Sequence, residues 1–189
     1  MNGIEIMEEN ETILLIIDMQ EKLIKGIDKR KEIIGNIIKL VKATKVLDIE
    51  TIISEQNSDR LGKTLENINT DETYNVYNKM SFSCLDCDEL LRQICISNKK
   101  NVVVAGIESH VCVLQTCINL ISRGYRSYVV TDAIGSRNFK DHKIALKRLE
   151  SEGAILTTAE STIFEWCKTA DRKEFKVISS IIKEPLLVQ

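Results

Sequence analysis

Three residues of reactive type stand where buried segments of the chain should end. Asp18 closes the apolar run TILLIID, Lys79 follows TYNVYN, and Cys112 lies six residues after Gly106 in GIESHVCVLQTC. A thiol attacks as a thiolate, and a helix N-terminus lowers its pKa. An aspartate can take the thiol proton and return it to a leaving group, while a nearby ammonium keeps that aspartate ionised. Together these side chains predict acyl transfer through a thioester, followed by hydrolysis.

Each of these residues also has an ordinary structural interpretation. A strand-end aspartate often caps a turn, a lone lysine usually lies in solvent, and a cysteine on an apolar helix usually packs in the core. The core interpretation is applied to all the other cysteines: Cys84, Cys87, Cys95, Cys117 and Cys167. The residue types therefore leave three alternatives to a hydrolase open: a scaffold protein, a redox-sensing thiol protein and a nucleic-acid enzyme.

Composition and charge argue against some of these classes of protein. The 189 residues suit a single domain, residues 1–189, with a sizeable core. A net charge of −2 provides no basic surface for nucleic acid or anionic lipid. The apolar runs are too short to span a membrane, and the start MNGIEIMEENE lacks the apolar segment of a secretory signal. We therefore expect a cytoplasmic protein with reduced cysteines and no membrane partner.

Metal-binding patterns are weak in this sequence. Cys84 and Cys87 form a C-x-x-C pair, but no second pair follows at zinc-ribbon spacing, and there are only 2 histidines. We therefore predict no metal site and no cofactor.

Strand-like and helix-like segments alternate along the chain. Strands are expected over residues 12–18, 50–55, 73–79, 101–107, 126–132 and 154–158. Helices are expected over residues 30–48, 86–97, 109–124, 139–153, 159–168 and 172–183, with the polar stretch QNSDRLGKT as a loop. This alternation predicts βαβ units, a parallel sheet and a three-layer α/β/α sandwich. Ligands bind beyond the carboxyl ends of such strands, where the strand order reverses, so Asp18 and Cys112 are expected to face one crevice.

Three blocks of the sequence resemble the isochorismatase-like cysteine hydrolases. LLIIDMQEKL is similar to the strand with the catalytic aspartate, NKMSFSCL to the segment with the catalytic lysine, and VVVAGIESHVCVLQTC to the nucleophile block. The resemblance covers roughly residues 11 to 168 and is closest to the isochorismatase domain-containing proteins. It implies a Rossmann-like sheet of six parallel strands in the order 3-2-1-4-5-6, and a triad of Asp18, Lys79 and Cys112. It also implies a cis peptide between Ile107 and Glu108, with the N–H groups of Glu108 and Cys112 forming an oxyanion hole.

Two departures from the family pattern narrow the implied reaction. Nicotinamidases of the family carry a D-x-H metal pair after the second strand, where this chain has SEQNSDRLGKT without histidine. Isochorismatases that cleave a vinyl ether do not use a cysteine at the position of Cys112. The resemblance thus implies a metal-independent hydrolase of a small amide, ester or carbamoyl compound, which works as a homo-oligomer, dimer or higher. The alternative is a catalytically weak scaffold or interaction protein with the same fold.

Five further residues are candidates for lining the pocket: Gln20, Glu55, Gln56, Phe82 and His110. Each has a second interpretation. Gln20 can bond loop backbone, Glu55 and Gln56 can simply end a strand, and Phe82 can pack in the core. His110 is expected at the rim of the site or at an interface, because a residue two positions from Cys112 on a helix points elsewhere.

Three polar residues near the site are expected to support structure. Ser109 is predicted as a helix N-cap. Asp132, at the expected end of the strand over 126–132, is predicted to hold the AIGSR loop by local hydrogen bonds, and Arg137 to brace a subunit contact.

Overall fold

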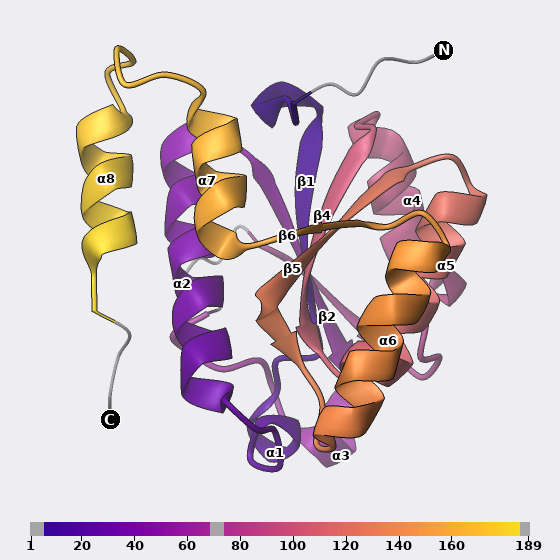
Figure 1. The fold of residues 1–189 in the computed structure, drawn as a ribbon. Coiled ribbons are helices and arrows are strands. Elements are labelled where there is room, and N and C mark those ends of the chain that lie inside the picture. Colours follow the sequence, from indigo (N-terminus) through magenta and orange to yellow (C-terminus); the bar gives the residue numbers. More distant parts are fainter. Residues whose placement is uncertain (1–5, 69–73, 186–189) are drawn as a thin grey trace.

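A parallel sheet forms the centre of the molecule. The computed structural model describes residues 6–68 and 74–185, and within them six strands pair in the order β3-β2-β1-β4-β5-β6 (Figure 1). Every pairing is parallel. The strands are β1 (Thr12–Ile17), β2 (Glu50–Gln56), β3 (Asn75–Lys79), β4 (Asn101–Ile107), β5 (Arg126–Gly135) and β6 (Ile155–Thr157). The predicted fold class and strand order are confirmed.

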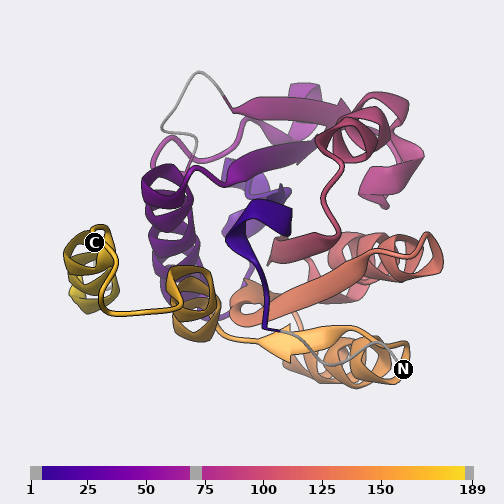
Figure 2. The same cartoon turned by 90° about the horizontal axis from the view of Figure 1, so that it is seen from above.

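Helices cover both faces of the sheet and make the two outer layers. One face carries α2 (Arg30–Leu47) and α7 (Ala159–Cys167), with α8 (Phe175–Lys183) packed outside them. The other face carries α4 (Asp88–Ser97), α5 (Leu114–Ser122) and α6 (Phe139–Ser151), as Figures 1 and 2 show. Shorter turns are η1 (Glu9–Glu11), α1 (Glu21–Ile24), α3 (Ser58–Leu61), η2 (Cys84–Asp86) and a π-helical turn, Ser109–Val113, which we call the nucleophile turn.

The central strands are buried on both faces. In β1, Leu14 and Ile16 pack in the core under α2 and α7, while Leu15 and Ile17 pack in the core under α4 and α5. All residues of β1 and β4 are buried. A strand covered on both sides has no polar face, which is why these segments read as continuous apolar runs.

The strand registers bring three chemical groups to one edge of the sheet. Ile17 lies opposite Ser54 of β2 and Gly106 of β4, and Gln56 of β2 lies opposite Lys79 of β3. Because the strands are parallel, the residue after β1, the end of β3 and the turn after β4 meet at the carboxyl edge.

Several element boundaries differ from the sequence prediction. The stretch predicted as a loop contains α3, the helix predicted from residue 109 starts as the nucleophile turn, and the last helix starts at Phe175. The strand predicted to end at residue 132 runs to Gly135, because its pairing with β4 resumes after an irregularity between Val104 and Gly106. Of the strand predicted over residues 73–79, residue 73 lies outside the described residues, and Lys79 ends β3 rather than following it. No helix among the described residues is long and apolar enough to cross a membrane.

Gly106 lets β1 and β4 approach closely at the edge that carries the site. Its φ is +118°, and a Cβ built on it would lie 2.1 Å from the carbonyl oxygen of Ile17. We expect Gly106→Ala to lower the free energy of unfolding by about 4 kcal/mol, because the cost of a positive φ in alanine and the cost of the clash with the Ile17 backbone add together. The measurement is urea unfolding.

The matched control is Gly124→Ala. Gly124 also has a positive φ, +87°, but an added Cβ meets nothing within 4 Å. We expect Gly124→Ala to lower the free energy of unfolding by only about 1–2 kcal/mol. Equal losses at the two positions would contradict a close β1–β4 approach.

Candidate active site

Asp18 is a fully buried carboxylate at the first position after β1. Its φ of +52° is in the left-handed region, and its N–H donates to the carbonyl oxygen of Ser54 at 3.0 Å. Its two carboxylate oxygens have different partners. Oδ1 accepts from the hydroxyl of Ser54 at 2.7 Å, and Oδ2 accepts from Nζ of Lys79 at 2.8 Å.

Lys79 forms a buried ion pair with Asp18, and both side chains are 0% exposed. Its ammonium also donates to Oε1 of Gln56 at 2.9 Å and to the carbonyl oxygen of Ser81 at 3.3 Å. Burial lowers the pKa of Lys79, but the charge of Asp18, the neighbouring cysteines Cys84 and Cys112 and the hydrogen bond to Asp18 together outweigh it, so the pKa lies above its ordinary value. Because an ammonium has three hydrogens and all have protein acceptors, Lys79 acts through Asp18.

Cys112 lies in the nucleophile turn and is 6% exposed. Burial raises the pKa of the Cys112 thiol far above its ordinary value, and the nearby carboxylate of Asp18 raises it further. Lys79 lowers it, but by less. The predicted lowering of this pKa by a helix N-terminus is therefore wrong, because desolvation and an adjacent carboxylate dominate. At neutral pH Cys112 is a thiol beside an ionised carboxylate.

Gln20 and Glu55 hold the loop that follows β2. Nε2 of Gln20 donates to the carbonyl oxygens of Gln56 and Gly62 at 3.0 and 2.6 Å, and its Oε1 accepts the Gln56 N–H at 2.7 Å. Oε1 of Glu55 accepts from the N–H and the hydroxyl of Thr64 at 2.7 and 3.0 Å. Both side chains are buried, so these two pocket candidates support Gln56 through the backbone of the loop.

Gln56 and Phe82 differ in their relation to the ion pair. Gln56 accepts from Lys79, and its Nε2 donates to the carbonyl oxygen of Met80 at 2.8 Å. The Phe82 side chain is 52% exposed, so packing of Phe82 in the core is wrong. Its role as a pocket wall stays a prediction.

Glu108 precedes the nucleophile turn, and its peptide bond to Ile107 is cis. Its carboxylate accepts from the backbone N–H of Arg137 at 2.9 Å and from Nε at 3.1 Å. Arg137 is thus paired within its own chain, and its subunit contact stays a prediction. The oxyanion role of the N–H groups of Glu108 and Cys112 also stays a prediction.

Ser109 and His110 tie the nucleophile turn to the start of α6. The Ser109 hydroxyl lies 3.0 Å from Nδ1 of His142, and Nδ1 of His110 lies 2.9 Å from the hydroxyl of Ser136. Ser109 lies inside the turn and Glu108 takes the capping position, so the predicted N-cap role of Ser109 is wrong. The physical reason is the π-helical start, which moves the helix boundary back by one residue.

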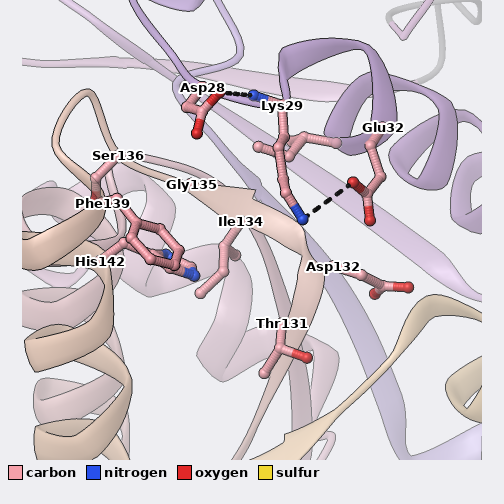
Figure 3. A pocket seen from close by; sticks show the side chains of 11 residues that line it. Asp28, Lys29, Glu32, Thr131, Asp132, Ile134, Gly135, Ser136, Phe139 and His142 are labelled. Atoms are coloured by element: carbon pink, nitrogen blue, oxygen red, sulfur yellow. Dashed lines mark hydrogen bonds and ion pairs between the residues drawn. The ribbon is translucent and has the colours of Figure 1, made fainter.

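A hollow of about 200 Å³ adjoins this turn (Figure 3). It lies between the start of α2 and the β5–α6 connection, and its walls include Lys29, Glu32, Ile134, Phe139 and His142. None of the three reactive residues lines it. Burial and the charge of Lys29 lower the pKa of His142, so its imidazole is neutral at neutral pH.

Asp132 caps a distant helix. It lies inside β5, its Oδ1 accepts the N–H of Ala159 at 2.8 Å, and its carbonyl oxygen accepts from Asn36 at the same distance. The prediction that Asp132 holds the AIGSR loop is wrong, because β5 continues beyond it and the side chain reaches the start of α7.

Sequence reasoning missed Ser54; it placed Cys84 correctly in the core but missed its contact with Ser54. The thiol of Cys84 is 3.5 Å from the Ser54 hydroxyl, which itself bonds Asp18, so Cys84 belongs to the surroundings of the site. The signal was strand alternation. It puts Ser54 on the face of β2 opposite to Glu55, toward the core that contains Cys84 and Cys112.

All six cysteines are free thiols. In the described parts of the chain, no group of three or more His, Cys, Asp or Glu side chains is arranged to hold a metal ion.

The fold and the site together define a doubly wound α/β protein with a buried Asp–Lys pair next to a buried cysteine at the carboxyl edge. The isochorismatase domain model matches residues 12–161. The secreted isochorismatase effector Isc1 of Phytophthora sojae is 36% identical over 95% of this chain and 88% of its own. Isochorismatase domain-containing protein 2 of Xenopus laevis is 35% identical over 94% of this chain and 86% of its own.

A solved structure agrees with these relatives. The MAR1 ribonuclease from Caenorhabditis elegans has a TM-score of 0.89 and 34% identity, and the match covers 96% of this chain and 94% of that one. The chain therefore belongs to the isochorismatase family and has that family's hydrolase fold.

Three of the four buried thiols are expected to make the fold sensitive to alkaline pH. Burial raises the pKa of Cys84 to about 11 and of Cys117 to about 12, and it also raises that of Cys112. An unfolded cysteine titrates near pH ~8.5, so this stabilising contribution is complete below that pH and is lost as pH rises toward the folded values. We expect the free energy of unfolding to fall above about pH 9, by roughly 1.4 kcal/mol per pH unit for each thiol.

Urea unfolding at a series of pH values measures this slope. Cys117→Ala removes one of the three thiols and should make the slope shallower. A free energy of unfolding that stays level between about pH 8 and 10 would contradict the buried, protonated state of these thiols.

Proposed function

We propose that this protein is a metal-independent cysteine hydrolase that cleaves small amide, ester or carbamoyl compounds through a thioester on Cys112. One observation carries the proposal. The buried thiol of Cys112 lies close enough to the carboxylate of Asp18 for that charge to raise its pKa, and Lys79 holds the carboxylate in a fully buried ion pair. A protonated nucleophile beside an ionised, fixed base is the arrangement that general-base activation requires.

The first half of the reaction forms the thioester. As the substrate carbonyl carbon meets Sγ of Cys112, the thiol proton moves to Asp18 and the carbon–sulfur bond forms. The N–H groups of Glu108 and Cys112 stabilise the oxyanion of the tetrahedral intermediate. Asp18 then returns the proton to the leaving nitrogen or oxygen, the bond to that atom breaks, and an amine or alcohol departs.

The second half regenerates the enzyme. Asp18 takes a proton from a water molecule, the hydroxide oxygen adds to the thioester carbon, and Cys112 leaves with the proton that Asp18 gives back. The product is the carboxylic or carbamic acid. In the resting site Lys79 is protonated, because the charge of Asp18 helps to raise its pKa.

The burial of the site favours small substrates. Asp18, Lys79 and Cys112 are 0%, 3% and 6% exposed, so only a narrow group can reach the sulfur. The C. elegans relative is named a ribonuclease. The net charge of −2 on this chain offers little attraction for a polyphosphate backbone, so RNA is tested as an alternative substrate.

Two expectations about the protein as a whole remain predictions: a homo-oligomer and a cytoplasmic location. Apolar side chains that a subunit contact would cover include Phe139 and Ile144 of α6, which are 55% and 57% exposed.

The hydrolase reaction is tested with a panel of small amides, esters and carbamoyl compounds, plus single-stranded RNA. We expect at least one small carbonyl compound to be hydrolysed, and Cys112→Ala and Asp18→Asn each to lower the rate by about a thousandfold or more. Mass spectrometry of the quenched wild-type reaction should find the acyl group on the Cys112 peptide.

Cys117→Ala is the matched control. It removes another buried thiol that lies outside the ion pair, and it should retain activity within about threefold. Hydrolysis that persists in Cys112→Ala, or cleavage of RNA alone, would contradict the proposal. No turnover of any compound, with no acyl adduct on Cys112, would favour the scaffold alternative.

A further inference from the structure

The Ser54 hydroxyl holds one oxygen of the buried carboxylate. Ser54 is 0% exposed, and its hydroxyl donates to Oδ1 of Asp18 at 2.7 Å, while Lys79 donates to Oδ2 at 2.8 Å. A carboxylate bound at both oxygens cannot turn about its Cβ–Cγ bond without losing a partner. The angle at which Asp18 meets the thiol of Cys112 therefore depends on Ser54 as much as on Lys79.

The thiol of Cys84 contacts the same hydroxyl. Its Sγ donates to Oγ of Ser54 at 3.5 Å, and its own N–H is anchored on the hydroxyl of Thr116 in α5 at 3.0 Å. Burial raises the pKa of Cys84 to about 11, so it keeps its hydrogen at neutral pH. A serine hydroxyl has one hydrogen and two lone pairs. Because Cys84 supplies a hydrogen to a lone pair, the single hydrogen of Ser54 is left for Asp18.

We propose that Ser54 is a positioning residue for proton transfer from Cys112 to Asp18, and that the Cys84 thiol sets the direction of the Ser54 hydroxyl. The inference rests on the proposed function and adds two residues to it. It also separates the roles of two buried thiols near one ion pair. Cys112 gives its proton to the carboxylate, whereas Cys84 donates only to Ser54 and orders the hydrogen bond behind it.

The test measures the reactivity of the Cys112 thiol in the absence of substrate. Native protein is alkylated with iodoacetamide at pH values from about 4 to 9, and the rate is followed on the Cys112 peptide by mass spectrometry. In wild type, the rate should hold a plateau through neutral pH, because Asp18 accepts the thiol proton. In Asp18→Asn this plateau should be absent, and labelling should rise only at alkaline pH.

Ser54→Ala leaves Oδ1 of Asp18 without its donor. We expect the plateau rate to fall about tenfold, because the carboxylate loses the hydrogen bond that fixes its orientation toward the thiol. Ser54→Thr keeps a hydroxyl and should restore the rate to within about threefold of wild type. A merely structural role of Ser54 would lower the free energy of unfolding without lowering the plateau rate.

Cys84→Ala and Cys117→Ala form a matched pair. Each removes a fully buried thiol, but only Cys84 contacts the Ser54 hydroxyl that bonds Asp18. Cys84→Ala should slow the labelling of Cys112 about threefold, and Cys117→Ala should leave it unchanged. If Ser54→Ala does not fold, this pair decides the question.

The outcomes separate this inference from the proposed function. Equal labelling rates of Cys112 in wild type and Asp18→Asn would mean that Asp18 is not the general base, and the proposed function would then be wrong. Slow labelling in Asp18→Asn, together with wild-type plateau rates in Ser54→Ala and Cys84→Ala, would overturn only the roles of Ser54 and Cys84.

Discussion

The buried ion pair between Asp18 and Lys79 is the constraint that the carboxyl edge of the sheet is built to meet. Removing two charges from water costs several kcal/mol per ion, and one close contact rarely repays it. Here the remaining polar atoms are also bonded: Ser54 donates to Asp18, while Gln56 and the Ser81 carbonyl accept from Lys79. Loss of either charge would leave the other buried and unpaired, at a cost of about 3–5 kcal/mol. The β1–β2–β3 register and the loop after β2 are therefore part of the site.

The same carboxylate determines the state of the nucleophile. Burial raises the pKa of the Cys112 thiol most, the negative charge of Asp18 raises it further, and the positive charge of Lys79 lowers it by less. The result is a protonated thiol with an aspartate beside it that can take its proton. Because oxidants react with thiolates, a protonated Cys112 reacts slowly with them. Asp18 can still remove the thiol proton when Cys112 attacks a bound carbonyl group. This argues against a redox-sensing role for Cys112.

Much of the fold follows from local pattern. The runs over residues 12–18 and 101–107 are apolar throughout because sheet neighbours and helices cover both faces, and α2 repeats its buried residues at helical spacing. The positions of Asp18, Lys79 and Cys112 at strand ends follow from that alternation. The direction of the Cys112 pKa shift cannot be predicted from that alternation, because desolvation depends on how deeply the folded chain buries the thiol. The contacts of Ser54 and Cys84 depend on the β1–β2 register. The partner that Asp132 finds in the structure depends on the extension of β5 to Gly135.

The central claim is that Cys112 rests as a thiol and passes its proton to Asp18. The ultraviolet absorbance of the thiolate tests it most directly, taken as the difference between wild type and Cys112→Ser across a titration from about pH 5 to 10. The account predicts no thiolate signal from Cys112 below about pH 9, since burial and Asp18 both raise the pKa of Cys112. A thiolate that appears with a midpoint below about pH 7 would contradict it and would mean that Lys79 and the helix N-terminus control the sulfur.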